Sequence, residues 1–535
     1  MADGGIRKSL RGLTALLAAC AIATAPAAAQ TASPRPPTFV IDGDPNSLDT
    51  IRNTPFGWLL GPLTQGYLFL VDDRGRLVPD RALRVPSREN GLISADGRTI
   101  TYEIRTGRWS DGAPFDAHDV AFTVSALRNP RTSVPDTSVV APIASVDVPR
   151  PDRLIVHLRY PWAPFVSSFL TLGADDPFAI LPRHIAAAYA SLDRSSLDER
   201  PVGLGPFRLA RWERGERLEF ERNPYAWRRA RSARVVVEIQ PAAQTRLVLA
   251  LSREIDAVAL TGLQVDAAQR GGLRTIATTT NLVDYLQLNV RRRPLDDVRV
   301  RRALAAALDR ARLARTVYRS ALVPRDDVQY DRAFAATRPL PRYDPAAAAR
   351  VLAPLHLTLE LAIAGDWRRS DDAAVQLAAD LQRAGVTVRI RSYAETTFWG
   401  PRDAGGILES GRYDLALTSW SPTLDPERSY LFGCAAQPPN GGNSMGWCDR
   451  AYDREEVAGA AVYEAAARAA HYRAAGDVLA SEVPVIPLGL ERSIYAVTPR
   501  LRGFRPNPLA RDFWNAWEWS SADTPIQAPA TTPKR

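Results

Sequence analysis

The residues that could carry acid–base chemistry gather in one short stretch, RWSDGAPFDAHDVAFTV, at residues 108–124. It brings Asp111, Asp116, His118 and Asp119 close together in the sequence. Carboxylates beside an imidazole are the groups that enzymes use as general acids and bases. The first question is whether this stretch does chemistry or builds the fold.

The elements expected around this stretch give its carboxylates structural roles. Residues 99–105 (TITYEIR) alternate apolar and polar side chains, which predicts a strand, and residues 110–112 form a turn. Asp116 occupies the N-cap position of a following helix, and Asp119 lies in its first turn, near the positive end of the helix dipole. Asn129–Pro130 ends that helix. We therefore interpret the stretch as scaffold.

Other enzyme motifs are missing from the sequence. None of the five histidines forms H-x-x-x-H or pairs with a nearby cysteine, and there is no G-x-S-x-G or phosphate loop. GLGPFRLA contains G-x-G but lacks the third glycine. We expect no catalytic residue, no metal site and no cofactor, and a protein that is not an enzyme.

The charge pattern argues against nucleic acid as a partner. The formal net charge is +9, and nearly all of the basic residues are arginines, since lysine occurs only at Lys8 and Lys534. The arginines are scattered among acidic residues, as in RWERGERLEFERN, and scattered charge is typical of a solvated surface.

The N-terminus predicts export. Three basic residues precede the apolar stretch LTALLAACAIATAPAAA, which ends in Ala27–Ala28–Ala29 before Gln30. A basic segment, a short apolar segment and an A-x-A site describe a secretory signal peptide over residues 1–29, and hence an exported protein. The alternative is LAAC at residues 17–20, which resembles a lipoprotein site with lipid on Cys20. No later segment is long and apolar enough to predict a membrane span.

Removal of the leader would leave two cysteines. Cys434 and Cys448 flank a loop rich in glycine and asparagine, and in an exported protein such a pair predicts a disulfide. The alternative is a pair of free buried thiols. A zinc site is disfavoured, because the loop contains no histidine and no third cysteine.

The rest of the chain alternates strands and helices, which predicts an α/β protein. Strands are expected at 235–240, 254–260, 285–290, 386–390 and 413–420, and helices at 245–252 and 371–384. Pro294–Asp297 opens a long helix in which Val300, Leu304 and Ala311 share a face.

Several segments, in order, resemble the extracellular solute-binding proteins of family 5, the peptide and nickel receptors of ABC importers. The segments that carry the resemblance are RWSDGAPFDAHDVAFTVSAL, GLGPFRL, RNPYAW, LQLNVRRRPLDDVRVRRALAAALDR, LQRAGVTVRI and YDLALTSW. Cys434, Asn443 and Cys448 resemble the disulfide loop of the dipeptide-binding branch.

The resemblance implies an α/β, two-lobed periplasmic-binding-protein fold (class II-like, cluster C), with mixed sheets and a hinge between the lobes. The implied boundaries are a first lobe at 30–279, with an extra subdomain at about 56–200, a second lobe at 280–488, a return to the first lobe at 489–520 and a disordered tail at 521–535.

The implied function is capture of a small solute, a short peptide or peptide-like compound, for delivery to the permease subunits of an ABC importer. The protein is expected to act as a monomer. The alternative is a receptor of the same fold for an opine-like compound, a metal chelate, haem or an oligosaccharide.

The expected ligand-binding residues follow the strand at 413–420. Ser419 and Trp420 end that strand, and Thr423 and Asp425 follow it. In dipeptide receptors an aspartate a few residues after a glycine–tryptophan pair holds the peptide's α-amine, but here SWSPTLDP is one residue shorter. Asp425 matches the later, structural D-P aspartate, which leaves Thr423 or Pro422 opposite the amine.

This departure leads to a hypothesis about the ligand. We hypothesise that the receptor does not select a free α-amine through the usual aspartate; the alternative is that Asp425 shifts into that role. Arg368 and Arg369 lie near the position where an arginine for the ligand's carboxylate is expected, and they favour an anionic ligand. Trp399 and Asn443 complete the candidate site.

Overall fold

The structure is a computed structural model that describes residues 35–51, 55–134, 137–174, 177–319, 321–365, 370–421, 423–509 and 512–522. The expected leader at 1–29 and most of the expected tail lie outside these residues. No helix in the described ranges is long and apolar enough to cross a membrane.

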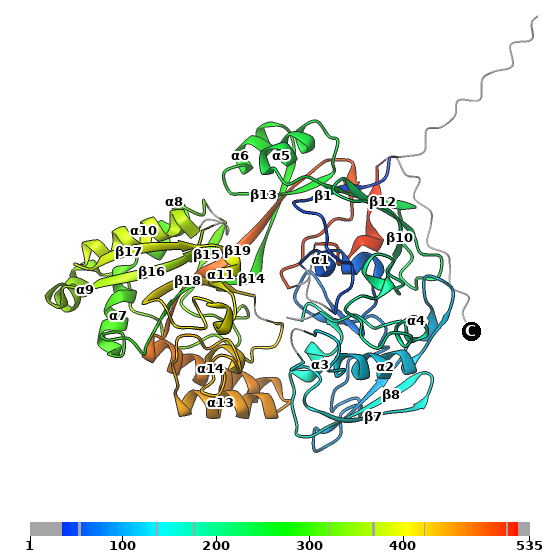
Figure 1. The fold of residues 1–535 in the computed structure, drawn as a ribbon, viewed down its shortest axis with the longest axis horizontal. Coiled ribbons are helices and arrows are strands. Elements are labelled where there is room, and N and C mark those ends of the chain that lie inside the picture. Colours follow the sequence, from blue (N-terminus) through cyan, green and yellow to red (C-terminus); the bar gives the residue numbers. More distant parts are fainter. Residues whose placement is uncertain are drawn as a thin grey trace, which may run out of the picture. The chain divides into compact units, whose positions relative to one another are not determined.

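An 11-stranded mixed sheet forms the backbone of the fold (Figure 1). Its order is β10-β11-β12-β1-β13-β19-β14-β18-β16-β17, and β15 also pairs with β19. One half of the sheet consists of β10 (Phe207–Glu213), β11 (Arg217–Arg222), β12 (Arg234–Ile239), β1 (Thr38–Ile41) and β13 (Ala257–Leu260). The other half consists of β18 (Leu415–Trp420), β16 (Thr358–Ala364), β17 (Thr387–Tyr393) and β15 (Leu322–Pro324).

Two long antiparallel strands cross the middle of this sheet. β14 (Arg274–Leu288) carries the chain from one half to the other, and β19 (Val485–Val497) brings it back. Their register shifts between Thr279 and Val283 and again between Asp284 and Tyr285. Such irregularities bend a strand and increase its local twist. The pairing of the two strands is therefore irregular where the chain passes between the two halves of the sheet.

Helices and strands beyond the crossing enclose one apolar core. Leu286 on β14, Leu361 on β16 and Leu415 on β18 are fully buried there with Leu304 and Leu377 from two helices. The helices of this half are α7 (Val298–Ala307), α8 (Arg310–Thr316), α9 (Pro345–Leu352), α10 (Ser370–Arg383), α11 (Glu395–Phe398), α12 (Ser429–Phe432), α13 (Arg450–Ala461) and α14 (Ala465–Glu482).

The prediction of a single long helix after Pro294 is wrong. The helical region is divided into α7 and α8, because Leu308 adopts an extended backbone conformation. Asp309 then caps α8 by accepting a hydrogen bond from the Arg312 amide. Ala311, which we expected on the apolar face of one helix, therefore belongs to the first turn of the second helix.

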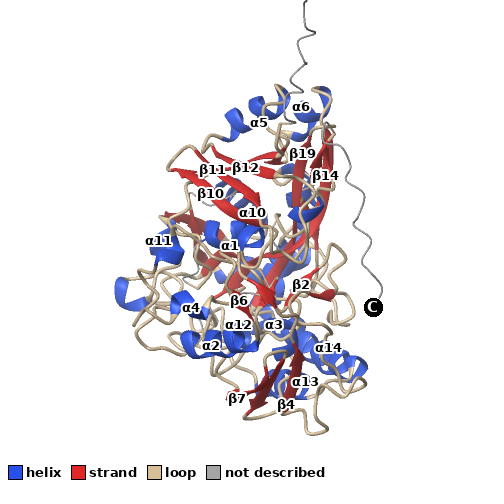
Figure 2. Cartoon of the chain, turned by 90° about the vertical axis from the view of Figure 1, so that its right-hand side faces the viewer, coloured by secondary structure: helices blue, strands red, loops and turns tan. Residues whose placement is uncertain are grey.

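Residues of the expected extra subdomain build a second core, which includes Tyr102, Trp109, Val120, Val156 and Phe165. Figure 2 labels several elements of this half outside the large sheet, among them α1, α2, β4 and β7. The strands are β2 (Phe69–Val71), β3 (Leu77–Pro79), β4 (Thr99–Glu103), β5 (Gly107–Arg108), β6 (Pro114–Phe115), β7 (Ile143–Arg150), β8 (Arg153–Leu158), β9 (Thr171–Leu172), β20 (Leu501–Arg502) and β21 (Ser520–Ser521). The helices are α1 (Pro55–Thr64), α2 (Ala117–Leu127), α3 (Phe165–Ser168), α4 (Arg183–Ala186), α5 (Ala243–Leu251) and α6 (Val265–Arg270). Short 3₁₀ turns lie at Ser196–Asp198, Ala353–Leu355, Arg402–Ala404 and Ala516–Glu518.

The stretch that raised the question of chemistry is used as scaffold. Asp116 accepts a hydrogen bond from the His118 amide at 2.8 Å, and Asp119 accepts one from the Asp116 amide at 3.1 Å, which is a capping box. Asp111 is 2.7 Å from the imidazole of His184. The predicted cap and helix are confirmed.

Residues from both ends of the described chain share a third core. The ring of Phe39 on β1 stacks on that of Trp519, with the ring centroids 4.2 Å apart. Phe504 and Phe513 pack against the same two rings. The chain after β19 thus packs against the strand with which the described chain begins.

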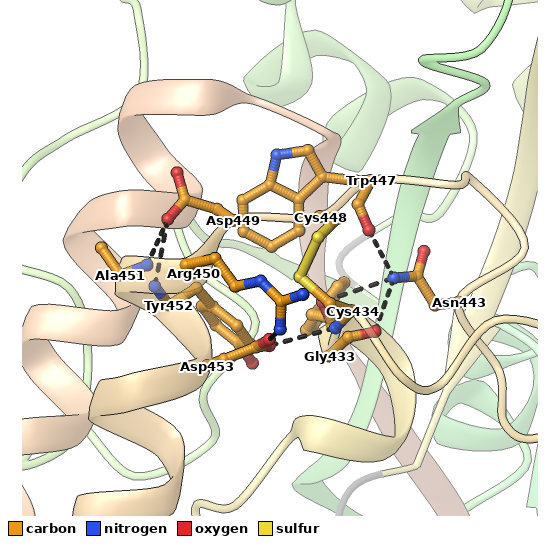
Figure 3. Close-up of a disulfide and its surroundings, with 11 residues drawn as sticks. Gly433, Cys434, Asn443, Trp447, Cys448, Asp449, Arg450, Ala451, Tyr452 and Asp453 are labelled. Carbon is orange, nitrogen blue, oxygen red and sulfur yellow. Dashed lines mark hydrogen bonds and ion pairs between the residues drawn. A yellow bond between two sulfur atoms is a disulfide. The ribbon is translucent and has the colours of Figure 1, made fainter.

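The predicted disulfide between Cys434 and Cys448 is confirmed (Figure 3). Asn443 closes the loop from inside, because its amide donates to the carbonyls of Gly433 at 2.9 Å and Trp447 at 2.7 Å. The Cys434 amide donates to Asp453 on α13 at 3.0 Å. The loop is therefore tied both to itself and to the following helix.

Replacing both cysteines by alanine is expected to lower the free energy of unfolding by about 3 kcal/mol, because the bridge closes a loop of about 15 residues in the unfolded chain. Urea unfolding followed by circular dichroism measures the change. Reduction of the wild-type protein should reproduce the loss, and reductant should leave the alanine variant unaffected. A loss below about 1 kcal/mol would contradict the prediction.

Candidate functional site

The candidate site begins at the carboxyl end of β18. Ser419 and Trp420 are the last residues of this strand and pair with Asp284 and Val283 of the crossing strand β14. The neighbouring strand β16 runs parallel to β18, so both strands end at the same edge of the sheet. This is the edge at which open α/β sheets bind ligands.

The loop after β18 is attached to the crossing strand and to a buried cation. The Ser421 hydroxyl donates to the side-chain oxygen of Asn281 on β14 at 3.0 Å. Trp420 is half-buried, and the guanidinium of Arg428 lies 5.1 Å from its ring centroid. An arginine over an indole face is a favourable cation–π arrangement. These contacts fix Trp420 at the junction of the two halves of the sheet.

Asp425 has an internal partner. Its side chain is 4% exposed, and Nη2 of Arg468 on α14 donates to both of its carboxylate oxygens at 2.7 Å. The Thr423 hydroxyl donates to the Asp425 carbonyl at 3.1 Å, and the Glu427 amide donates to the Asp425 carboxylate at 3.1 Å. The negative charge of Asp425 is therefore compensated within the protein.

More charged residues are buried next to this pair. Arg428 is 2% exposed; it donates to the Glu427 carbonyl at 2.7 Å and to the side-chain oxygen of Gln329 at 2.8 Å. Its backbone amide donates to the carboxylate of Glu456 on α13 at 2.8 Å. Burial, together with the nearby charge of Glu427, raises the pKa of Glu456 to about 8. Glu456 is therefore largely protonated at neutral pH, and fewer negative charges need partners in this interior.

The other predicted residues lie on other segments. Trp399 follows α11, is 40% exposed and packs edge-to-face against Phe398, with the ring centroids 5.0 Å apart. Asn443 is fully buried, and its amide is used within the disulfide loop. Arg368 and Arg369 follow β16 and lie outside the described residues. The structure thus brings together Ser419, Trp420, Thr423 and Asp425.

Sequence reasoning did not identify Arg428, Glu456 and Arg468. Arg468 is separated from Asp425 by 43 positions and Glu456 from Arg428 by 28, so no local pattern joins them. A signal existed for Arg468 alone, since a charged residue on the otherwise alanine-rich α14 must face water or a partner.

Comparison with known proteins identifies the class. The family model for bacterial extracellular solute-binding proteins, family 5 (Middle), matches residues 84–441. The chain belongs to this family, as the sequence motifs predicted.

Similar proteins extend the match over nearly the whole chain. Di/tripeptide-binding protein 2 of Pseudomonas aeruginosa is 26% identical over 92% of this chain and 96% of its own length. The glutathione-binding protein GsiB of Salmonella paratyphi A is 24% identical over 78% of this chain and 82% of its own. The crystal structure of a dipeptide-binding protein from a Pseudoalteromonas species, in complex with Met-Leu, superposes with a TM-score of 0.76 at 21% identity, covering 91% of this chain and 100% of the other. The predicted periplasmic-binding-protein fold is confirmed.

Proposed function

We propose that this protein is the periplasmic binding component of an ABC importer, and that it captures a short peptide or peptide-like compound between two lobes. The observation that carries the proposal is the alignment of nearly the whole chain with a relative named for di- and tripeptides. The lobes would be residues 30–279 with 489–520, and residues 280–488. Both boundaries lie within the crossing strands β14 and β19, where a bend would open or close the cleft.

The proposed setting follows from the family. The protein would be exported by the leader at 1–29, act as a monomer and pass its ligand to permease subunits in the membrane. Catalysis is not part of the proposal, because Asp116 and Asp119 form the capping box of α2. The His118 imidazole lies 3.0 Å from the Asp116 carboxylate, and Asp111 lies 2.7 Å from the imidazole of His184.

Native mass spectrometry of the freshly purified protein tests the function directly. We expect a bound peptide or peptide-like compound to co-purify, and dipeptides such as Met-Leu to raise the unfolding temperature, since a ligand that binds the folded state stabilises it. An opine-like compound, a metal chelate, haem or an oligosaccharide in its place would retain the receptor role and change the ligand class. Absence of any ligand, together with no response to a panel of all these compounds, would contradict the proposal.

We further propose that recognition does not use Asp425 to bind a free α-amine. Two contacts support this: Arg468 already neutralises Asp425, and Thr423 offers a hydroxyl that cannot neutralise an ammonium group. Enclosing an unpaired ammonium would cost several kcal/mol. A ligand with a blocked, absent or differently placed amine avoids this cost.

Calorimetry with Met-Leu and its N-acetylated form separates the two possibilities. The acetylated form is expected to bind at least as tightly as the free dipeptide, because the site would then enclose no unpaired positive charge. If the free form binds more than about tenfold tighter, a difference of about 1.4 kcal/mol, and Asp425→Asn abolishes the difference, Asp425 is the amine site after all.

A further inference from the structure

A short loop of the proposed second lobe reaches into the proposed first lobe. Residues 460–464 comprise the last two residues of α13 and the loop 462–464 that leads to α14, and these helices contribute Tyr452, Ala475 and Leu479 to a core of the second lobe. Tyr463, at the tip of the loop, packs instead against the core of the extra subdomain in the first lobe. The loop is thus a direct contact between two cores that the sequence places in different lobes.

Four contacts hold this loop. The Tyr463 hydroxyl donates to the Gly97 carbonyl at 2.9 Å, and the Arg88 guanidinium lies 5.1 Å from the centroid of its ring. Arg88 also forms an ion pair with Glu464 at 2.7 Å. The backbone is joined as well, because the Ala163 amide donates to the Ala460 carbonyl at 2.7 Å.

The surface that receives Tyr463 depends on a glycine. Gly97 has a φ of +69°, which a side chain rarely adopts, and a Cβ atom there would lie 2.6 Å from the Tyr463 ring. The ring therefore rests directly on the backbone of the turn between residues 94 and 99. The Gly97 turn and the Arg88 guanidinium together form the binding surface for the Tyr463 ring.

The helix pair α13 and α14 is also connected to the candidate ligand site. Arg468, which binds the Asp425 carboxylate through Nη2, also donates through Nε to the Gly459 carbonyl at 3.1 Å. Gly459 lies immediately before residues 460–464, and a Cβ atom there would lie 2.9 Å from the Tyr472 ring on α14. The two helices are therefore packed too closely to slide independently. Arg468 therefore links the loop after β18 directly to the backbone next to residues 460–464.

We propose that residues 460–464 are a latch that holds the two lobes closed, and that Arg468 couples this latch to the ligand-binding loop. The inference rests on the proposed closure of two lobes, and it adds the element that sets the dissociation rate of the bound ligand. The Tyr463 ring contributes most of the free energy of this contact between the lobes, because the Arg88–Glu464 pair is partly exposed and such pairs contribute little. The latch is small enough to open without unfolding either core.

Tyr463→Ala and Arg88→Ala test the latch, with Arg84→Ala as the matched control. Arg84 forms an exposed ion pair with Glu103 in the same segment and does not touch the loop. Three measurements apply: the radius of gyration in solution scattering without ligand, hydrogen exchange at the Ala163 amide, and the dissociation rate of Met-Leu. Tyr463→Ala should increase all three, the dissociation rate by roughly tenfold; Arg88→Ala should raise that rate by less than about fivefold, and Arg84→Ala should change nothing.

Tyr463→Phe separates the latch from simple damage to the fold. It keeps the ring on Gly97 and removes the hydroxyl, so exchange at Ala163 should stay closer to the wild type than in Tyr463→Ala. If scattering and exchange are the same in the wild type, Tyr463→Ala and Arg88→Ala, the latch is overturned, whichever ligand the protein binds. Failure of Met-Leu to bind would bear on the proposed function alone, because the first two measurements need no ligand.

Discussion

Replacing Arg468 by methionine is expected to lower the free energy of unfolding by about 3–5 kcal/mol. The reason is that Asp425, 4% exposed, would keep its charge and lose the guanidinium that neutralises it. Removing one partner of a buried ion pair costs more than the pair contributes, because the remaining charge has no water to replace the partner. Urea unfolding monitored by circular dichroism gives the value.

Two further variants show whether the effect belongs to the buried pair. Arg299→Met breaks an exposed pair with Asp297 and should cost far less than Arg468→Met. The double variant Asp425→Leu with Arg468→Met removes both charges and should recover much of the loss. If Arg468→Met costs as little as Arg299→Met, the interior around Asp425 is hydrated and the assignment of a structural role is wrong.

Glu456→Gln is expected to change how stability depends on pH. Burial, and then the charge of Glu427, raise the folded-state pKa of Glu456 from 4.5 to about 8. Between these values the folded protein holds a proton that the unfolded chain releases, so the contribution of Glu456 is full below pH 4.5 and is lost as pH rises towards 8. The loss approaches about 1.4 kcal/mol per pH unit.

The measurement compares unfolding free energies of the wild type and Glu456→Gln at intervals from pH 5 to pH 8. Glutamine cannot ionise, so the wild type should lose stability relative to the variant as pH rises, by about 3 kcal/mol in all. Glu395→Gln, at an exposed position on α11, controls for the substitution itself. Parallel pH profiles for the wild type and Glu456→Gln would mean that Glu456 is ionised in the folded protein.

Local patterns predicted the parts of the fold that depend on neighbouring residues. The cap of α2 was predictable because Asp116 and Asp119 act within one helical turn. The end of β18 at Trp420 was predictable because LALTSW has the apolar residues of a buried strand. The disulfide was predictable because two cysteines flank one loop.

Features made by distant residues could not be predicted in this way. β14 begins at Arg274, whereas the strand was expected to begin at residue 285. The first half was missed because it is polar and is recognisable only by its pairing with β19. β19 itself contains Pro487 and Gly489, which weaken a strand pattern. The partner of Asp425 lies on α14, so the role of Asp425 was decided by tertiary packing.

The stacking of Phe39 on Trp519 has a consequence for the order in which the molecule is made. A ribosome presents Phe39 long before it has synthesised Trp519, so the core that needs both rings cannot form on a growing chain. Until the last stretch emerges, the nascent polypeptide lacks one of its finished cores. For a member of an extracellular family, this delay favours transport, because a membrane pore passes an unfolded chain. Completion of this core is thereby postponed until the whole polypeptide has been synthesised.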